Sequence, residues 1–191
     1  MINQNISNMM KACAILMVIF EHILVWYFHI NSSLNMILGT GGVAIFLILS
    51  GYGLTVSYLT KGISDEYWEH KIRKVFIPYW VVTGLYAIIT GLVTPSNSET
   101  LLENILLIDY DRRIDGTMWY LSFLLIWYVL FGGIFKYKYS LWIKILLLFA
   151  FAWLFFDNPS GWFGECSWQF SRNAFSFPAG VLLGGFISAA R

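Results

Sequence analysis

The feature that most constrains the fold of this chain is a series of long apolar runs that contain no charged residue. Four such runs cover residues 40–59, 75–93, 117–135 and 174–190. A helix that crosses a lipid bilayer needs about 20 consecutive, mostly apolar residues. Each run reaches or approaches this length, and we predict that all four form transmembrane helices.

Two further apolar runs carry charge. Residues 9–30 contain Lys11, Glu21, His22 and His29, and the shorter run 141–156 contains Lys144 near one end. Hydrophobic residues make up 58% of the 191 positions and charged residues only 12%, a composition that a water-soluble domain of this size would not have. We therefore predict an all-α, polytopic transmembrane bundle of about six spans.

The distribution of basic residues predicts the orientation of the bundle. With a cytoplasmic N-terminus, nine of the twelve basic residues fall in cytoplasmic segments, namely Lys11, Lys61, Lys71, Arg73, Lys74, Lys136, Lys138, Lys144 and Arg191. Outside are only Arg112, Arg113 and Arg172. Cytoplasmic segments of membrane proteins are enriched in lysine and arginine, so we predict that the N-terminus is cytoplasmic.

The outer loop between the second and third charge-free runs contains apolar residues at helical spacing. These are Leu101, Leu102, Ile105 and Ile108. Residues 99–108 are therefore predicted to form a short helix on the outer surface.

The cysteines, the histidines and the net charge bear on whether the chain has a disulfide, a metal site or a nucleic-acid partner. Cys13 lies in the first helix and Cys166 in a loop predicted on the opposite side, so we expect two free thiols. No histidine or cysteine pair has metal-ligand spacing with a third ligand nearby, and we expect no metal site. A net charge of +1 argues neither for nor against nucleic acid, and we expect no nucleic-acid partner.

The first apolar run carries the residues best suited to chemistry. A charged group inside a membrane helix costs about 3 kcal/mol or more unless it is paired, so such groups are functional candidates. Lys11 and His22 are eleven positions apart, which places them within about 20° on one helix face and about 16 Å apart along its axis. An imidazole in the outer half of the helix suits a general base for a hydroxyl.

Each of these residues also has a structural interpretation. His22 is equally explained as a core histidine that bonds a neighbouring helix, and Lys11 as a lysine that extends to the membrane interface. His29 shares the face of His22 but is expected among the lipid head groups. Glu21 points about 100° away from His22, so we expect it to contact another helix and not the same ligand.

The segment before the third run is basic, with Lys71, Arg73 and Lys74. Taken alone, these cations are best explained by membrane orientation and contact with lipid head groups. The glycines at positions 39, 41, 42, 51 and 53 are best explained by close helix packing.

Four motifs occur together between residues 10 and 121. Lys11 is followed eleven positions later by His22, and residues 42–52 contain phenylalanine followed by Ser-Gly-Tyr. Residues 71–79 form a basic segment that ends in Ile-Pro-Tyr, and residues 118–121 read Met-Trp-Tyr-Leu. This combination resembles the membrane-bound acyltransferase-3 family, whose members acylate sugars of surface polysaccharides and related acceptors.

The resemblance implies roles for the candidate residues. His22 would be the catalytic histidine, and Lys11 a partner near the donor. Glu21, which precedes His22 in the chain, is a second catalytic candidate. Lys71, Arg73 and Lys74 would bind the phosphates of coenzyme A, although the family usually has arginines in this loop.

The implied reaction is O-acetylation at the cell surface. The chain would transfer an acetyl group from cytoplasmic acetyl-CoA to a hydroxyl of a surface glycan or lipid-linked sugar. We expect a multi-pass protein of the bacterial plasma membrane, surrounded by membrane lipids, and the sequence leaves a homo-oligomer open.

The chain is shorter than members of the family. The family has about ten helices, so we expect residues 1–191 to be a single acyltransferase-3-like membrane domain, apparently truncated at the C-terminus. A carboxylate from a late helix of the family has no counterpart that we can assign. Two alternatives stay open: an inactive truncated relative, and a small transporter or channel in which Lys11, Glu21 and His22 line a solute path.

Overall fold

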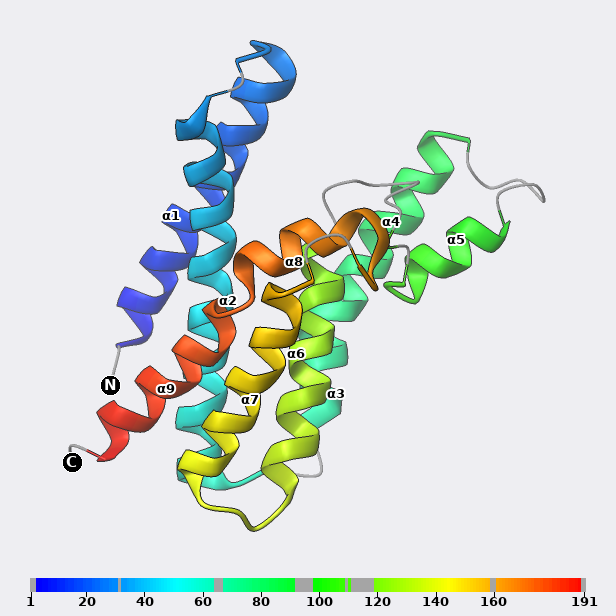
Figure 1. The fold of residues 1–191 in the computed structure, drawn as a ribbon. Helices are drawn as coiled ribbons and strands as arrows, with labels where there is room; N and C mark the ends of the chain where they lie inside the picture. The colour runs from blue at the N-terminus through cyan, green and yellow to red at the C-terminus, as the bar shows by residue number, and fades with distance from the viewer. Residues whose placement is uncertain are drawn as a thin grey trace. The chain divides into compact units, whose positions relative to one another are not determined.

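The computed structural model of the chain describes residues 3–30, 32–63, 67–91, 98–108, 110, 119–158 and 161–189. Every regular element in these residues is a helix (Figure 1), which confirms the all-α prediction. The elements in chain order are α1 (Gln4–His22), η1 (Ile23–Tyr27), α2 (Ser33–Lys61), α3 (Tyr67–Lys71), η2 (Ile72–Phe76), α4 (Ile77–Ile89), α5 (Ser98–Ile105), α6 (Trp119–Lys136), α7 (Leu141–Phe156), η4 (Gly164–Cys166), α8 (Ser167–Asn173) and α9 (Ser176–Ala189).

Four helical stretches are long and apolar enough to cross a membrane. They are Gln4–Tyr27, Asn35–Lys61, Tyr67–Ile89 and Trp119–Lys136. The last three stretches each contain most of one predicted charge-free run. The first contains most of the charged run that begins at Met9. These stretches make the chain a membrane protein.

Two predicted spans are shorter in the structure. Helix α7 has 16 residues and α9 has 14, fewer than the roughly 20 that a bilayer requires. The run predicted at 174–190 is shortened because α8 ends at Asn173 and the next two residues form a turn.

The chain divides into two compact units. The first consists of Met1–Gly62, Lys138–Pro159 and Gln169–Arg191, and the second of Ile63–Tyr137 and Ser160–Trp168. Each is described by itself. The prediction that the chain acts as a single domain stays a prediction.

In the first unit, α2 packs against α9 through glycines. A Cβ atom at Gly51 would overlap the carbonyl oxygen of Phe177, and a Cβ atom at Gly180 would overlap the backbone of Ile48. Small residues of this kind let two helix backbones touch. The packing explanation is therefore confirmed for Gly51, whereas Gly53 faces open space.

Helix α1 lies alongside α2 (Figure 1) and also packs on its glycines. A Cβ atom at Gly42 would lie 2.7 Å from Val18 Cγ2 and 2.8 Å from the carbonyl oxygen of Ala14. Ala14 itself is fully buried. The two helices therefore form a close antiparallel pair.

Lys144 is buried inside the first unit and does not extend to a surface. Its side chain on α7 is only 1% exposed. The ammonium donates a hydrogen bond of 2.6 Å to the hydroxyl of Tyr58 on α2 and lies 4.5 Å from the centre of that ring. A buried cation is stabilised by such partners.

In the second unit, α3, η2 and α4 run on continuously and pack against α6. The hydroxyl of Tyr67 donates to the carbonyl of Tyr128 at 3.0 Å, and its ring stacks on Phe131. The predicted short helix is present as α5, and Tyr79 of α4 bonds the Asn104 carbonyl at 2.5 Å and its side-chain oxygen at 2.9 Å. These bonds fasten α5 to α4.

The two cysteines are free thiols, as predicted. Cys166 is buried in the second unit, and its backbone N–H donates to the carbonyl of Tyr110 at 3.2 Å. Burial raises the pKa of the Tyr110 phenol, and the nearby Cys166 adds to this effect.

Candidate active site

The first candidate cluster lies at the end of α1. His22 is the last residue of that helix, and its Nδ1 atom is 2.7 Å from Glu21 Oε2 and 2.9 Å from the carbonyl oxygen of Val18. Their side chains are partly exposed, 38% for His22 and 22% for Glu21. Within the described part of the chain, Nε2 of His22 has no hydrogen-bond partner.

The contact between Glu21 and His22 corrects one sequence prediction. Adjacent residues point about 100° apart on a helix, and on that basis we expected Glu21 to contact only another helix. The glutamate side chain is long enough for its carboxylate to reach the neighbouring ring. It also meets the expected second helix, because a Cβ atom at Gly39 of α2 would lie 3.1 Å from Glu21 Cδ.

Lys11 lies on the same helix, toward its N-terminal end. Its side chain is exposed. The eleven residues between Lys11 and His22 lie in one regular helix, so the predicted axial separation of about 16 Å holds. The structure therefore keeps these two groups at different depths along α1.

The second candidate cluster is the basic segment, and its three cations have different surroundings. The Lys71 ammonium lies 4.4 Å from the ring centre of Tyr128 and 5.5 Å from that of Tyr67, in a cation–π arrangement. Arg73 pairs with Glu69 at 2.9 Å, and both side chains are well exposed, so the pair is weak. Lys74 is exposed. Of these three cations, Arg73 and Lys74 are exposed and Lys71 is partly buried.

Both clusters adjoin a π-helical turn, a feature that the sequence reading missed. The turn η1 begins immediately after His22, and η2 contains Arg73 and Lys74. Short π-helical turns inside α-helices occur frequently at functional sites. The turn η2 lies between α3 and α4, whereas η1 ends the first helical stretch, and apolar periodicity gives no signal for either.

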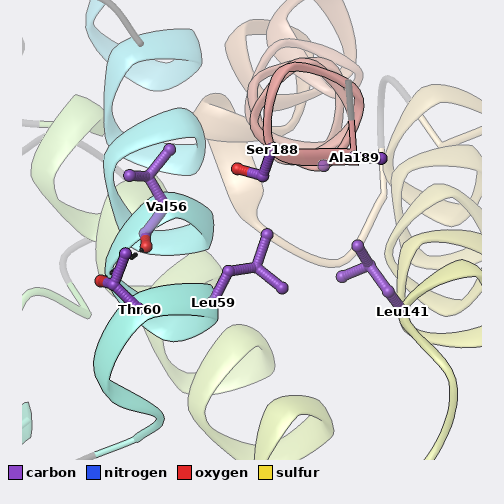
Figure 2. A pocket seen from close by; sticks show the side chains of 7 residues that line it. Val56, Leu59, Thr60, Leu141, Ser188 and Ala189 are labelled. Carbon is purple, nitrogen blue, oxygen red and sulfur yellow. Dashed lines mark hydrogen bonds between the residues drawn. The ribbon is translucent and has the colours of Figure 1, made fainter. Parts of the chain in front are cut away.

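The first unit also contains a pocket, which is distinct from the His22 cluster. It has a volume of about 400 Å³ and is lined by Val56, Leu59, Thr60, Leu141, Gly185, Ser188 and Ala189. Figure 2 shows the apolar side chains of α2 and α7 around it. The pocket lies at the Lys61 end of α2, about 25 Å along the helix from Gly39, and holds none of the predicted site residues.

The comparison with protein families decides the class of this chain. The family model of the acyltransferase-3 domain, described as an acyltransferase domain, matches residues 5–189. The chain belongs to the acyltransferase-3 family. The comparisons with curated proteins and with solved structures found no match.

Family membership extends the resemblance from four motifs to nearly the whole chain. The protein is a membrane acyltransferase, and the matched residues include both the His22 cluster and the basic segment. The His22 cluster lies in the first unit and the basic segment in the second.

Proposed function

We propose that this acyltransferase moves an acetyl group from cytoplasmic acetyl-CoA to a hydroxyl of a surface glycan or lipid-linked sugar. The observation that carries the proposal is the state of His22. It is a half-exposed imidazole in a helix that can span a membrane, with one ring nitrogen bonded and the other without a partner among the described residues. An imidazole of this kind suits proton abstraction from a hydroxyl near neutral pH.

The reaction places His22 between the acceptor and the donor. The acceptor oxygen attacks the thioester carbonyl carbon while Nε2 of His22 takes the hydroxyl proton. A C–O bond forms and the C–S bond breaks. The departing thiolate of coenzyme A then receives that proton from the imidazolium, so the products are the acetyl ester and free coenzyme A.

The predicted topology assigns donor and acceptor to opposite sides. With a cytoplasmic N-terminus in a bacterial plasma membrane, the basic segment faces the compartment that supplies acetyl-CoA, and Lys11 lies on the same side. His22 lies about 16 Å further along α1, closer to an acceptor presented outside. The acetyl group would pass through the helix bundle from the cytoplasmic side to the outer side.

Labelled acetyl-CoA tests this proposal directly. The purified protein in vesicles, supplied with [¹⁴C]acetyl-CoA and surface-glycan fragments, should release coenzyme A thiol only when acceptor is present, with label in the glycan. Passage of label across the membrane without thiol release would support the transporter alternative. An absence of both would support the inactive relative.

Removing the two exposed cations is expected to weaken use of the donor. The double variant Arg73→Ala/Lys74→Ala should raise the KM for acetyl-CoA by about 10-fold, because exposed, salt-screened ion contacts contribute about 0.2–1 kcal/mol each and about 1.4 kcal/mol corresponds to a tenfold change. The KM for the acceptor should stay unchanged. Steady-state kinetics against each substrate measures the two values, and added salt should partly reproduce the effect.

A matched control separates donor binding from membrane orientation. The variant Lys136→Ala/Lys138→Ala also removes two exposed cations that are predicted to be cytoplasmic. It should leave the KM for acetyl-CoA unchanged. Equal effects in the two double variants would mean that the basic segment serves orientation alone.

A further inference from the structure

We propose that Glu21, seated against Gly39 of the neighbouring helix, is a positioning residue that fixes the tautomer of His22. The catalytic part of this inference rests on the proposed function, and the structural part does not. The carboxylate would hold the proton on Nδ1 and thereby leave the lone pair on Nε2, where the acceptor hydroxyl is to be deprotonated.

The first step of the argument is the set of atoms around Nδ1. Its two neighbours are oxygens, Glu21 Oε2 at 2.7 Å and the carbonyl of Val18 at 2.9 Å. A neutral imidazole has one N–H and one lone pair, and a carbonyl or an ionised carboxylate can only accept. Nδ1 must therefore carry the proton, since a lone pair there would face two oxygens. Nε2 is then the basic nitrogen.

The second step is the packing of the Glu21 side chain against Gly39 of α2. A Cβ atom at Gly39 would lie 3.1 Å from both Cγ and Cδ of Glu21 and 3.3 Å from Oε2. These distances are shorter than ordinary van der Waals contact, so an added Cβ would require the glutamate to shift by a few tenths of an ångström, and a larger side chain would displace it further. The α2 backbone cannot retreat freely, because Gly42 packs against Ala14 and Val18 one turn further along. Glycine at position 39 therefore leaves free the space that the carboxylate occupies.

The third step is the charge that develops during the reaction. When Nε2 takes the hydroxyl proton, His22 becomes an imidazolium, and a carboxylate 2.7 Å from Nδ1 stabilises that cation. The Nδ1 proton stays in place throughout, and the Nε2 proton goes to the leaving thiolate. Glu21 stays ionised and contacts neither substrate, which makes it a positioning residue.

The experiment that decides the proposal measures which tautomer His22 adopts. The chain has three histidines, so a His29→Asn/His70→Gln background leaves His22 alone. ¹⁵N NMR of this protein, labelled at histidine and reconstituted in lipid, reports which ring nitrogen is unprotonated. We expect Nε2 in the parent, and a mixture of both tautomers in Glu21→Ala and in Gly39→Leu.

A matched glycine variant controls for a change of side-chain volume in α2. Gly53→Leu lies in the same helix, at a position where no other atom lies within 4 Å of an added Cβ, and it should leave the tautomer unchanged. A single Nδ1–H tautomer that persists in Glu21→Ala would overturn the proposal, because Val18 alone would then fix the ring. An Nε2–H tautomer in the parent would overturn it as well.

The kinetic consequence is tested in parallel. Glu21→Ala and Gly39→Leu should lower kcat by about 10-fold or more, since loss or displacement of an orienting carboxylate removes the productive tautomer, with the KM for acetyl-CoA unchanged. Variants that keep full kcat despite a mixed tautomer would overturn the positioning role. If the parent transfers no acetyl group, the proposed function fails, and the tautomer measurement still decides the structural claim by itself.

Discussion

Replacing His22 by alanine is expected to lower acyl transfer by about 100-fold or more, the range for loss of a general base. The protein should remain folded, because the two hydrogen-bond contacts of the ring are to Glu21 and Val18 on its own helix. The substitution therefore removes the base, and neither of the two hydrogen bonds lost with it joins α1 to another helix, because both lie within α1. Acceptor-dependent release of coenzyme A by reconstituted protein measures the effect.

A second histidine provides the control. His29 is exposed and lies beyond η1 with a positive φ of 54°, a conformation that asparagine tolerates better than most residues. His29→Asn should therefore keep both the fold and the activity. Wild-type turnover by a well-folded His22→Ala protein would show that another group takes the hydroxyl proton, and a loss of activity in His29→Asn alone would point to the wrong histidine.

The main features of the fold could be predicted from apolar runs because a bilayer sets a minimum length for every span. The runs at 40–59, 75–93 and 117–135 each lie largely within a long helix of the structure. Of the run at 174–190, the described part of the chain shows residues 176–189 as a helix. Run length records composition and carries no information about where a helix begins. The turn after Asn173 shortens this run.

Contacts between side chains were less predictable than the helices. The distribution of basic residues assigns Lys144 to the cytoplasmic segments, yet it is buried against Tyr58. Lys71 is partly buried and lies over the rings of Tyr67 and Tyr128. Tyr58 and Tyr128 are far away in sequence from their lysines, so spacing along one helix could not reveal these two contacts. Tyr67, by contrast, lies only four residues before Lys71.

The Glu21–His22 contact shows a different limit. Helical angle predicts the direction in which a Cβ atom points, but the end of a glutamate side chain can swing back toward its neighbour. The angle between Glu21 and His22 on the helix therefore did not predict that Glu21 Oε2 lies 2.7 Å from His22 Nδ1. Gly39 could be predicted from the sequence to lie at a close helix contact. That the residue facing it is Glu21 of α1 could not be predicted.

Replacing Gly180 by leucine is expected to have the largest effect on stability. A Cβ atom at this position would overlap the backbone of Ile48, and a backbone cannot rotate out of the way as a side chain can. Helices α2 and α9 would have to separate, which should lower the free energy of unfolding by about 3 kcal/mol or more.

Gly53→Leu is the matched control for the Gly180→Leu experiment, because Gly53 lies within α2 but faces open space. Leucine favours a helix over glycine by about 0.8 kcal/mol, so this control should be neutral or slightly stabilising. Thermal unfolding in detergent, followed by size-exclusion chromatography, measures both variants. A Gly180→Leu protein that unfolds at the wild-type temperature would show that α9 does not pack on α2 through this glycine. The expected result is a large loss in Gly180→Leu alone, because only there does the added side chain meet another backbone.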